Sequence, residues 1–248
     1  MILKKIKKAI IEFRENNNTL KSQNEFIINQ NAELEWAHIY NDTIRGRKWL
    51  EDSSISPGRW AANYSFLYIL IRILSDCKPK KIIELGLGES SKIISSFLKH
   101  ELHESTHLII EHNNEWIKLY GSTFSISQNS NILHLESEIK IVNGFPVNSY
   151  KQINEAIDET FDLYIIDGPH GSDRYSRYDI CSLLEKMNCK SEFILVFDDY
   201  HRVGEQDTVN DTIKILNKIG IKNYTGEFAG NKSQIVIATE KYKYTVSL

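Results

Sequence analysis

The chain has 248 residues, of which 41% are hydrophobic and 25% charged, and its formal net charge is −3 at pH 7. This composition is typical of a soluble globular protein with one sizeable domain and an appendage, and the charge gives no basis for nucleic-acid binding. Its three cysteines form no CxxC pair and no apolar run approaches the roughly 20 residues of a membrane span, so we expect a cytoplasmic protein without a secretory leader.

Residues 1–40 contain no glycine or proline and carry an apolar repeat of seven residues. One position of the repeat is occupied by Ile6, Phe13, Leu20, Ile27 and Leu34. The companion position, four residues later, holds Ile10 and then Asn17, Asn24 and Asn31. Buried asparagine at such positions lowers stability but fixes register and oligomeric state. The pattern therefore predicts a helical arm that joins two or three copies of the chain.

Two other interpretations of this arm stay open. The helix could pack on the rest of its own chain. Alternatively, the lysines between Lys4 and Lys8 lie beside Ile6 and Ile10, so the start of the arm could rest on an anionic membrane surface. Glu12 and Glu15 follow closely and weaken that second alternative.

Residues 41–80 lead to the centre of the sequence. Residues 52–60 are predicted to form a loop, because Pro57-Gly58 is a turn signal. Residues 61–74 then show an apolar face at helical spacing, and Pro79 ends this segment.

Residues 81–100 predict a strand, a glycine turn and a helix. Residues 82–85 are mostly apolar, Gly86 and Gly88 interrupt the strand, and Ser90 or Ser91 is predicted to cap the helix. Glycines let a ligand approach the backbone, and the free N–H groups of the helix point toward it, which favours a nucleotide-binding corner. A dinucleotide fingerprint would need glycine at position 91, so Ser91 disfavours an NAD-dependent oxidoreductase.

The next predicted strand, residues 106–111, ends at Glu111, which lies 23 residues beyond Gly88. At this spacing, Rossmann-like folds place a carboxylate that accepts both ribose hydroxyl protons. Glu111 could instead be an exposed charge at a strand end. Residues 131–136 predict a third strand, and residues 137–150 give no clear pattern.

Two later strands end in acidic residues, Asp167 on one and the pair Asp198 and Asp199 on the other. Carboxyl ends of parallel strands meet at one edge of a sheet, so these three side chains are expected to converge. Without a metal ion, a proton or a basic partner they would repel each other strongly. Residues 208–219 then predict a helix, and residues 221–228 and 233–239 predict a hairpin around Gly230.

The motif Glu84-x-Gly86-x-Gly88 resembles the first motif of the class I S-adenosylmethionine (SAM) methyltransferases. The resemblance implies an α/β fold with a Rossmann-like seven-stranded sheet that ends in an antiparallel hairpin, over residues 41–248. It also implies that SAM is the cofactor and that the acid of the motif reaches the ammonium group of SAM. The cofactor-binding residues implied in this way are Glu84, Gly86, Gly88, Ser90, Glu111 and Asp167.

Two subfamily resemblances concern the acidic residues. Asp167, Asp198 and Asp199 look like the magnesium site of catechol O-methyltransferase, although that family has asparagine where this chain has Asp199. The sequences Asp167-Gly-Pro-x-Gly and Asp199-x-x-Arg202-x-x-Glu are similar to motifs of the glucuronoxylan 4-O-methyltransferases. In that comparison Asp198 replaces a histidine and His170 replaces an arginine. These similarities imply transfer of a methyl group to a hydroxyl, with a divalent metal such as Mg²⁺ as a second candidate cofactor.

We therefore predict a SAM-dependent O-methyltransferase that acts on a carbohydrate. His170 is the favoured base, with His201 and Asp167 as alternatives, the last directly or through a metal. Each histidine could also be a loop residue bonded to a carboxylate. The residues predicted to contact an acidic acceptor are Arg59, Trp60, Arg174, Arg177 and Arg202, although the arginines could simply neutralise the aspartates.

Two rival functions stay open alongside this prediction. One is a metal-dependent methyltransferase of small molecules. The other is a non-catalytic scaffold that works through the coiled coil and keeps a vestigial SAM pocket.

Overall fold

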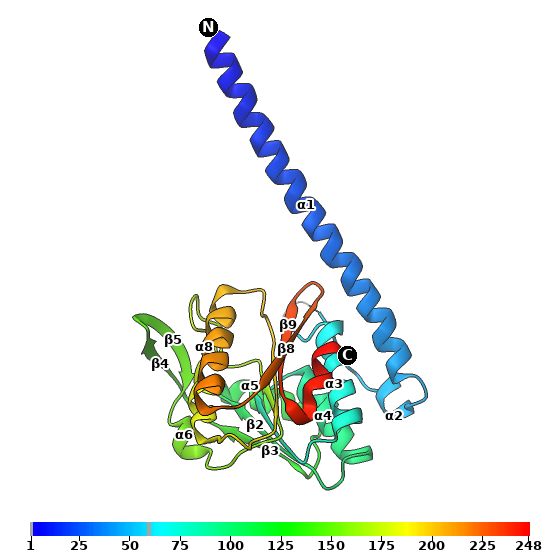
Figure 1. The fold of residues 1–248 in the computed structure, drawn as a ribbon. Helices are drawn as coiled ribbons and strands as arrows, with labels where there is room; N and C mark the ends of the chain where they lie inside the picture. Colours follow the sequence, from blue (N-terminus) through cyan, green and yellow to red (C-terminus); the bar gives the residue numbers. More distant parts are fainter. Residues whose placement is uncertain (1, 59–60) are drawn as a thin grey trace.

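The computed structural model describes residues 2–58 and 61–248, and its centre is a seven-stranded sheet (Figure 1). The strand order is β3-β2-β1-β6-β7-β9-β8, in which β9 runs antiparallel to both of its neighbours. The strands are β1 (Lys81–Leu85), β2 (Thr106–Glu111), β3 (Ser130–His134), β6 (Leu163–Ile166), β7 (Ile194–Phe197), β8 (Asn223–Ala229) and β9 (Ser233–Thr239). This arrangement confirms the predicted Rossmann-like sheet with its C-terminal antiparallel hairpin.

The order of the strands determines where a ligand can bind. The chain builds outward from β1 to β2 and β3, and then returns to place β6 on the other side of β1. At this switch point the loops after β1 and β6 leave in opposite directions, which opens a crevice at the carboxyl ends of the strands.

Helices cover both faces of the sheet because its central strands are buried on both sides. Ile82 and Ile165 lie in the core beneath α3 (Tyr64–Cys77) and α4 (Glu89–His100). Ile83 and Ile166, the next residues along the same two strands, lie in a second core on the opposite face of the sheet. That core is covered by α6 (Ile153–Ala156), α7 (Asp179–Leu183), the 3₁₀ helix η1 (Leu184–Lys186) and α8 (Val203–Ile219). The helix α5 (Asn114–Thr123) packs its Tyr120 on Ile109 of β2.

Three local predictions need correction or completion. The helix α4 begins at Glu89 with Gly88 as its N-cap, so neither Ser90 nor Ser91 is the cap; Ser91 lies one turn inside and accepts the N–H of Gly88. The unassigned stretch before β6 forms a separate hairpin of β4 (Ser137–Val142) and β5 (Phe145–Tyr150). The last residues form the 3₁₀ helix η2 (Glu240–Ser247).

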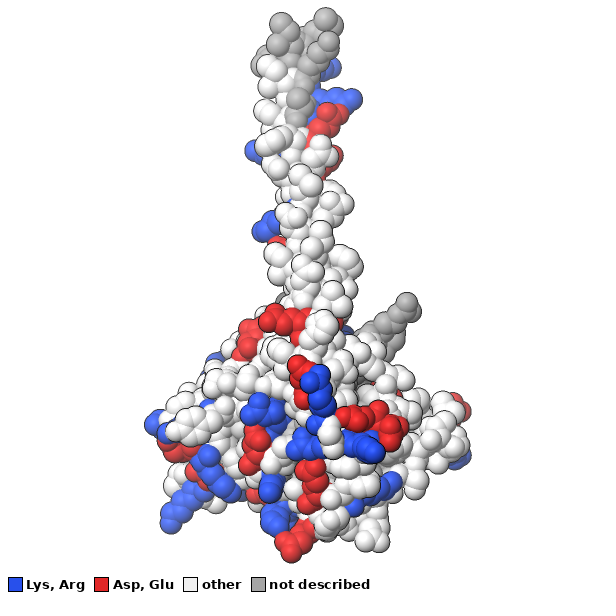
Figure 2. Space-filling model, turned by 90° about the vertical axis from the view of Figure 1, so that its right-hand side faces the viewer, with Lys and Arg blue, Asp and Glu red and all other residues white. Residues whose placement is uncertain are grey.

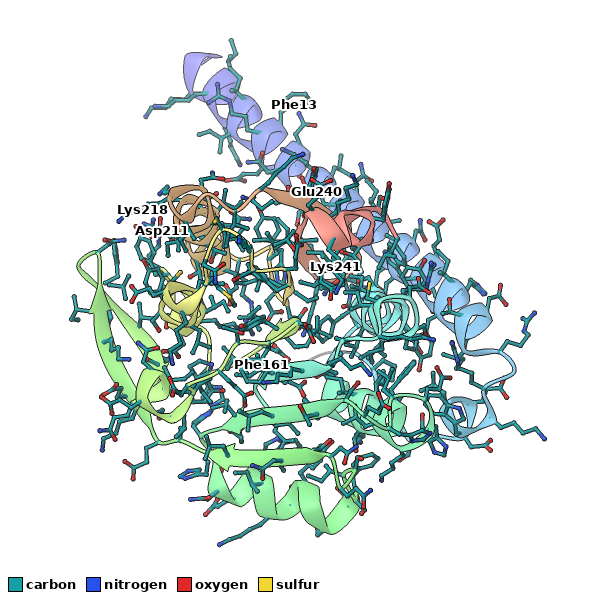
Figure 3. The ribbon with its side chains drawn as sticks, turned by 60° about the horizontal axis from the view of Figure 1, so that its bottom comes forward. Phe13, Phe161, Asp211, Lys218, Glu240 and Lys241 are labelled. Carbon is teal, nitrogen blue, oxygen red and sulfur yellow. The ribbon has the colours of Figure 1, made fainter. Side chains whose placement is uncertain are left out.

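The N-terminal helix α1 (Ile2–Ile44) projects far from the body (Figure 1). All side chains that the structure describes before Gln30 are exposed, including Phe13 at 67% and Leu20 at 56%. We call residues 2–29 the free arm; its 28 residues span about 42 Å at 1.5 Å per residue. Figure 3 shows Phe13 on this projecting part, away from the sheet. The free arm does not pack on its own domain, which removes that alternative for residues 2–29.

The C-terminal part of α1 is attached firmly to the body. Trp36 and Tyr40 pack into the core over α3, and the indole N–H of Trp36 donates to the carbonyl of Ala229 at 2.9 Å. The short helix α2 (Lys48–Glu51) follows and buries Leu50. The helical arm therefore continues past residue 40 into the domain, and only its first two thirds are free.

Glu33 is the polar anchor of α1. One oxygen of its carboxylate accepts the Tyr64 N–H at 2.8 Å at the start of α3, where the helix dipole favours a negative charge. The other oxygen accepts from Asn63 Nδ2 at 2.8 Å and from the Asn231 N–H at 2.9 Å. Glu33 thus joins three segments that lie far apart in the sequence.

Within the described residues, no helix combines the length and the apolar character that crossing a bilayer requires. Figure 2 shows one face of the body on which basic and acidic side chains are intermixed, below an arm with few charges along its middle.

Replacing Glu33 by alanine is expected to lower the free energy of unfolding by about 2 kcal/mol, because three donors lose a charged acceptor. Chemical denaturation followed by circular dichroism measures this change. Glu35→Ala is the matched control, since Glu35 is exposed on the same helix, and it should change stability by less than about 0.5 kcal/mol. Equal effects of the two substitutions would contradict the assigned role of Glu33.

Candidate active site

A cavity of about 380 Å³ lies at the carboxyl ends of β1, β2, β6 and β7. One half is lined by the turn after β1 and by residues that follow β2, among them Glu111 and Trp116. The other half is lined by the loops after β6 and β7 and by Lys232 of the β8–β9 hairpin. The cavity therefore has two differently built halves that meet at Gly86 and Asp167.

Gly86 allows the two halves to meet. Its φ is +104°, which favours glycine, and its N–H donates to the carbonyl of Ile110 at 2.9 Å. A Cβ at this position would lie 3.2 Å from the backbone of Asp167 and Gly168. The loop after β6 therefore reaches the cavity only because both strands end in glycine-containing turns. Gly88, in contrast, does not line the cavity and serves as the N-cap of α4.

Glu84 does not face the cavity, contrary to the role that the family resemblance implies. Its carboxylate is fully buried and accepts hydrogen bonds from the hydroxyls of Ser90 and Ser91. His107 Nε2 of β2 lies 3.1 Å from it. Glu84 and Ser90 thus hold the start of α4 against β1 and β2 from inside, and neither side chain lines the cavity.

Glu111 lines the cavity and is held by the backbone around it. Its Oε1 accepts the N–H groups of His112 and Asn113 at 2.8 and 2.7 Å, and its Oε2 accepts the Leu87 N–H at 3.1 Å. A carboxylate has about four acceptor sites, so one on Oε2 stays available to a ligand hydroxyl. Glu111 is therefore not a free strand-end charge, and it ties the turn after β1 to the end of β2.

This half of the cavity is completed by three side chains that the sequence did not indicate. Trp116 of α5 donates its indole N–H to the carbonyl of Leu87 at 2.7 Å. Tyr150 of β5 donates its hydroxyl to the carbonyl of Ile110, and burial raises its pKa well above the usual value. His112 lies edge-on to the ring of His170 at 4.8 Å, and burial lowers the pKa of His112. The half is thus lined by uncharged rings around a single carboxylate.

Asp167, Asp198 and Asp199 converge as predicted, with one oxygen of each lying within 4.8 Å of the others. Arg177 lies between two of them, because its Nη2 is 3.0 Å from Asp167 Oδ1 and 2.8 Å from Asp199 Oδ2. Arg202 Nη1 lies 3.0 Å from the same oxygen of Asp199. Arg177 and Arg202 therefore neutralise the aspartates, as one of the open alternatives held, while both still line the cavity.

The pKa values of two of these carboxyl groups shift in opposite directions. Burial raises the pKa of Asp167 above its usual value; Arg177 opposes this rise, while Asp198 and Asp199 add to it. Burial also acts to raise the pKa of Asp199, but Arg177, Lys232 and Arg202 together outweigh it and lower that pKa. Asp199 therefore keeps its charge more readily than an ordinary aspartate, whereas Asp167 gains a proton more easily than an ordinary aspartate.

Three carboxylates are a donor set that suits Mg²⁺. The residues around them do not fit a metal, however, because Arg177, Arg202 and Lys232 already face the same oxygens. The cations around the aspartates therefore disfavour the expected magnesium site of the catechol methyltransferase type.

The structure separates the two candidate histidines. His170 lines the cavity on an exposed loop whose carbonyls at His170 and Gly171 accept from Asn148 Nδ2. His201 is exposed outside the cavity lining, and its Nδ1 accepts the Ser233 N–H at 3.4 Å. The geometry places His170, and not His201, where it could meet a ligand.

Of the remaining predicted contacts, Arg174 is described by the structure and does not line the cavity. Arg174 pairs with Asp207, with Nη2 3.0 Å from Oδ1, and lies in a neighbouring hollow over the ring of Phe145. Arg59 and Trp60 lie outside the described residues. Lys232 was missed because its turn position in the hairpin gave no signal of a contact with residues 34 positions earlier.

No protein-family model matches the chain, and no curated protein matches it. Among solved structures, it is similar to the O-methyltransferase TomG of Streptomyces achromogenes, involved in tomaymycin synthesis (11% identity, 81% of this chain and 88% of that one, TM-score 0.48). It is also similar to an O-methyltransferase of Bacillus cereus (12% identity, 85% of this chain and 91% of that one, TM-score 0.47). A third similar structure is the precorrin-6y C5,15-methyltransferase of Geobacter metallireducens (13% identity, 76% of this chain and 96% of that one, TM-score 0.47). Because identities and TM-scores are this low, the functional argument rests on the geometry of the site.

Proposed function

We propose that the protein is a class I SAM-dependent O-methyltransferase whose acceptor is a carbohydrate hydroxyl. The observation that carries this proposal is the composition of the cavity at the carboxyl ends of the strands. A glycine turn and Glu111 form one half, and a histidine and an aspartate form the other half. The first half suits a nucleoside with ribose hydroxyls, and the second half offers groups that accept a proton.

The residues present fit SAM. The backbone of Gly86 and Leu87 borders the cavity, and the ring of Trp116 lines its wall. Glu111 Oε2 keeps one acceptor site that a ribose hydroxyl could use. When bound, SAM supplies a methyl group that its sulfonium already activates. Glu84 would act only as a support of this turn.

The chain's own part in the reaction is to orient a hydroxyl and to remove its proton. As the acceptor oxygen forms its bond to the methyl carbon, the carbon–sulfur bond breaks and its electron pair stays on sulfur. His170 takes the hydroxyl proton in this proposal, because its imidazole can accept a proton and lines the acceptor half of the cavity. Asp167 is the alternative base, since burial raises its pKa.

The polar lining of the acceptor half favours a hydroxylated acceptor. Arg202 and Lys232 line it and offer donors for ligand oxygens. The neighbouring hollow carries Phe145, which is 39% exposed and lies 6.0 Å from the ring of Tyr175. The C–H faces of sugar rings pack well on such aromatic surfaces. A small molecule with a hydroxyl is the second candidate acceptor, and a screen of both classes decides between them.

Replacing Glu111 by alanine or glutamine is expected to weaken S-adenosylhomocysteine binding about 10- to 100-fold, because a charged acceptor of the ribose is lost. Isothermal titration calorimetry of the purified protein, in magnesium and then in chelator, measures this affinity. Glu115→Ala, an exposed carboxylate on the next helix, should leave it unchanged. If the unaltered protein binds no S-adenosylhomocysteine in either buffer, the proposed function is wrong.

Replacing His170 by alanine is expected to lower the turnover number about 10²- to 10⁴-fold with little change in S-adenosylhomocysteine affinity, because only proton removal is lost. The rate is measured with the acceptor that a sugar screen identifies. His201→Ala is the comparison and should reduce the rate less than about twofold, since His201 lies outside the cavity lining. The reverse order of effects would assign proton removal to His201.

We also propose that the free arm forms a parallel coiled coil with a second copy of the chain. An isolated helix of this length is marginal in water, and its apolar seam lies exposed, with Ile27 at 53%. In a parallel pair each of Asn17 and Asn24 meets its own copy, which satisfies both amides. An antiparallel pair would instead bring Lys7, Arg14 and Lys21 of the two copies to the same flank, where like charges repel.

The double substitution Leu20→Glu with Ile27→Glu is expected to yield a monomer, because it places carboxylates inside the seam. Size-exclusion chromatography with light scattering should give twice the chain mass for the unaltered protein and the single mass for the variant. Ser22→Glu adds a charge on the opposite side of the same helix and should keep the pair. A monomeric unaltered protein at micromolar concentration would contradict the coiled coil.

A further inference from the structure

The acidic cluster is surrounded by as many cations as it has aspartates. The aspartates are Asp167, Asp198 and Asp199. The cations are Arg177, Arg202 and Lys232, and each of them has a nitrogen within 4.0 Å of a carboxylate oxygen of the cluster. Glu205, which is fully buried, adds a fourth acid, 3.8 Å from Arg177 Nε. The two arginines contact carboxylate oxygens on only one side of the cluster.

The carboxylate oxygens on the other side of the cluster face Lys232. Among the described residues, Asp198 Oδ2 and Asp199 Oδ1 are the aspartate oxygens of this cluster that are buried without a hydrogen-bond partner. Lys232 Nζ lies 3.6 Å from the first and 3.5 Å from the second. The other oxygen of each of these two aspartates already accepts, since Gln234 Nε2 donates to Asp198 Oδ1 at 2.8 Å and Arg177 donates to Asp199 Oδ2.

A divalent metal held between Asp198 and Asp199 would take these same two oxygens, because they are the ones without a hydrogen-bond partner. An ion about 2.1 Å from Asp199 Oδ1 would lie within about 6 Å of the Lys232 ammonium, and both charges would be poorly solvated. Lys232 cannot easily leave, because its side chain is 12% exposed and its Nζ donates to the carbonyl of Ala61 at 3.1 Å. We propose that Lys232 is the resident cation of this site and excludes a divalent metal from it.

The N-terminal helix fixes Lys232 in this place. Glu33 accepts the Asn231 N–H next to Lys232 and also binds Asn63 and Tyr64, which follow Ala61 closely. A Cβ at Gly230 would lie 2.4 Å from Glu33 Oε2, so the turn must carry glycine to reach the helix. Asn63 Oδ1 accepts from Gln234 Nε2, which donates to Asp198 as well. Glu33 is thus a positioning residue for both the ammonium and its acceptor carboxylate.

This inference concerns the charge in the site and does not depend on the proposed methyl transfer. If the transfer takes place, Lys232 offers its ammonium from the cavity wall to an oxygen of the acceptor, where a metal enzyme would offer the metal. Exclusion of the metal and methyl transfer are tested independently, because metal binding is measured without SAM or an acceptor.

The test is a titration with Mn²⁺, followed by electron paramagnetic resonance, of the full-length protein and of Lys232→Met. Methionine keeps the apolar stem of the side chain and removes the ammonium, so the variant should bind Mn²⁺ more than about tenfold more tightly than the unaltered protein. Lys214→Met, which removes an exposed lysine from α8, should leave Mn²⁺ binding unchanged. Equal Mn²⁺ affinity of Lys232→Met and the unaltered protein would overturn the proposal.

A second variant keeps the test decisive if Lys232→Met does not fold, as judged by its thermal melt. Asp198→Asn removes one of the two oxygens while it retains Lys232. Where Lys232 already excludes the metal, Asp198→Asn and the unaltered protein bind Mn²⁺ equally weakly. Micromolar binding by the unaltered protein that disappears in Asp198→Asn would instead show a true metal site and sink the proposal.

Discussion

The cavity exists because two backbones approach each other closely, at Gly86 after β1 and at Gly168 after β6. A Cβ on Gly168 would lie 2.9 Å from the Cα and N of Gly86 and 2.4 Å from the Tyr150 hydroxyl. Only hydrogen atoms fit between these chains. The contact draws the loop that carries Asp167 and His170 over the switch point of the sheet, so the half with Glu111 and the half with the acidic cluster share one cavity.

The charges at that edge are costly to bury and therefore demand a fixed arrangement. Removing one partner from a buried ion pair leaves an uncompensated charge, which destabilises a protein far more than replacing the whole pair. Here Asp199 is shared by Arg177, Arg202 and Lys232, which come from three different parts of the chain. The loop after β6, the start of α8 and the β8–β9 hairpin are consequently held together by one carboxylate.

The sheet could be predicted from the sequence because its strands are apolar runs that end at polar residues. The predicted strands at residues 106–111 and 233–239 agree with β2 and β9. The hairpin of β4 and β5 was not predicted, because Ile139 and Ile141 are exposed and no buried face sets a periodic pattern. The spacing to Gly88 predicted Glu111, and the positions of Asp167 and Asp199 at the ends of two strands predicted that they meet. The sequence could not show that Glu84 turns inward to Ser90 and Ser91, or that Lys232 crosses to Asp198, since both depend on packing between distant segments.

The N-terminal helix connects the two parts of the molecule that the sequence suggested were separate. Glu33 binds the turn that carries Lys232, and Asn31, two residues earlier, belongs to the repeat of the arm. A partner that binds the arm stabilises the helical state of α1, and helix formation is cooperative along its length. The free energy of that binding therefore supports the contacts of Glu33 as well. If the proposed coiled coil forms, a ligand that favours the present position of Lys232 strengthens the binding of that partner by the amount by which the partner strengthens the binding of the ligand. The proposed association of the arm and the position of Lys232 would then be coupled through one continuous helix.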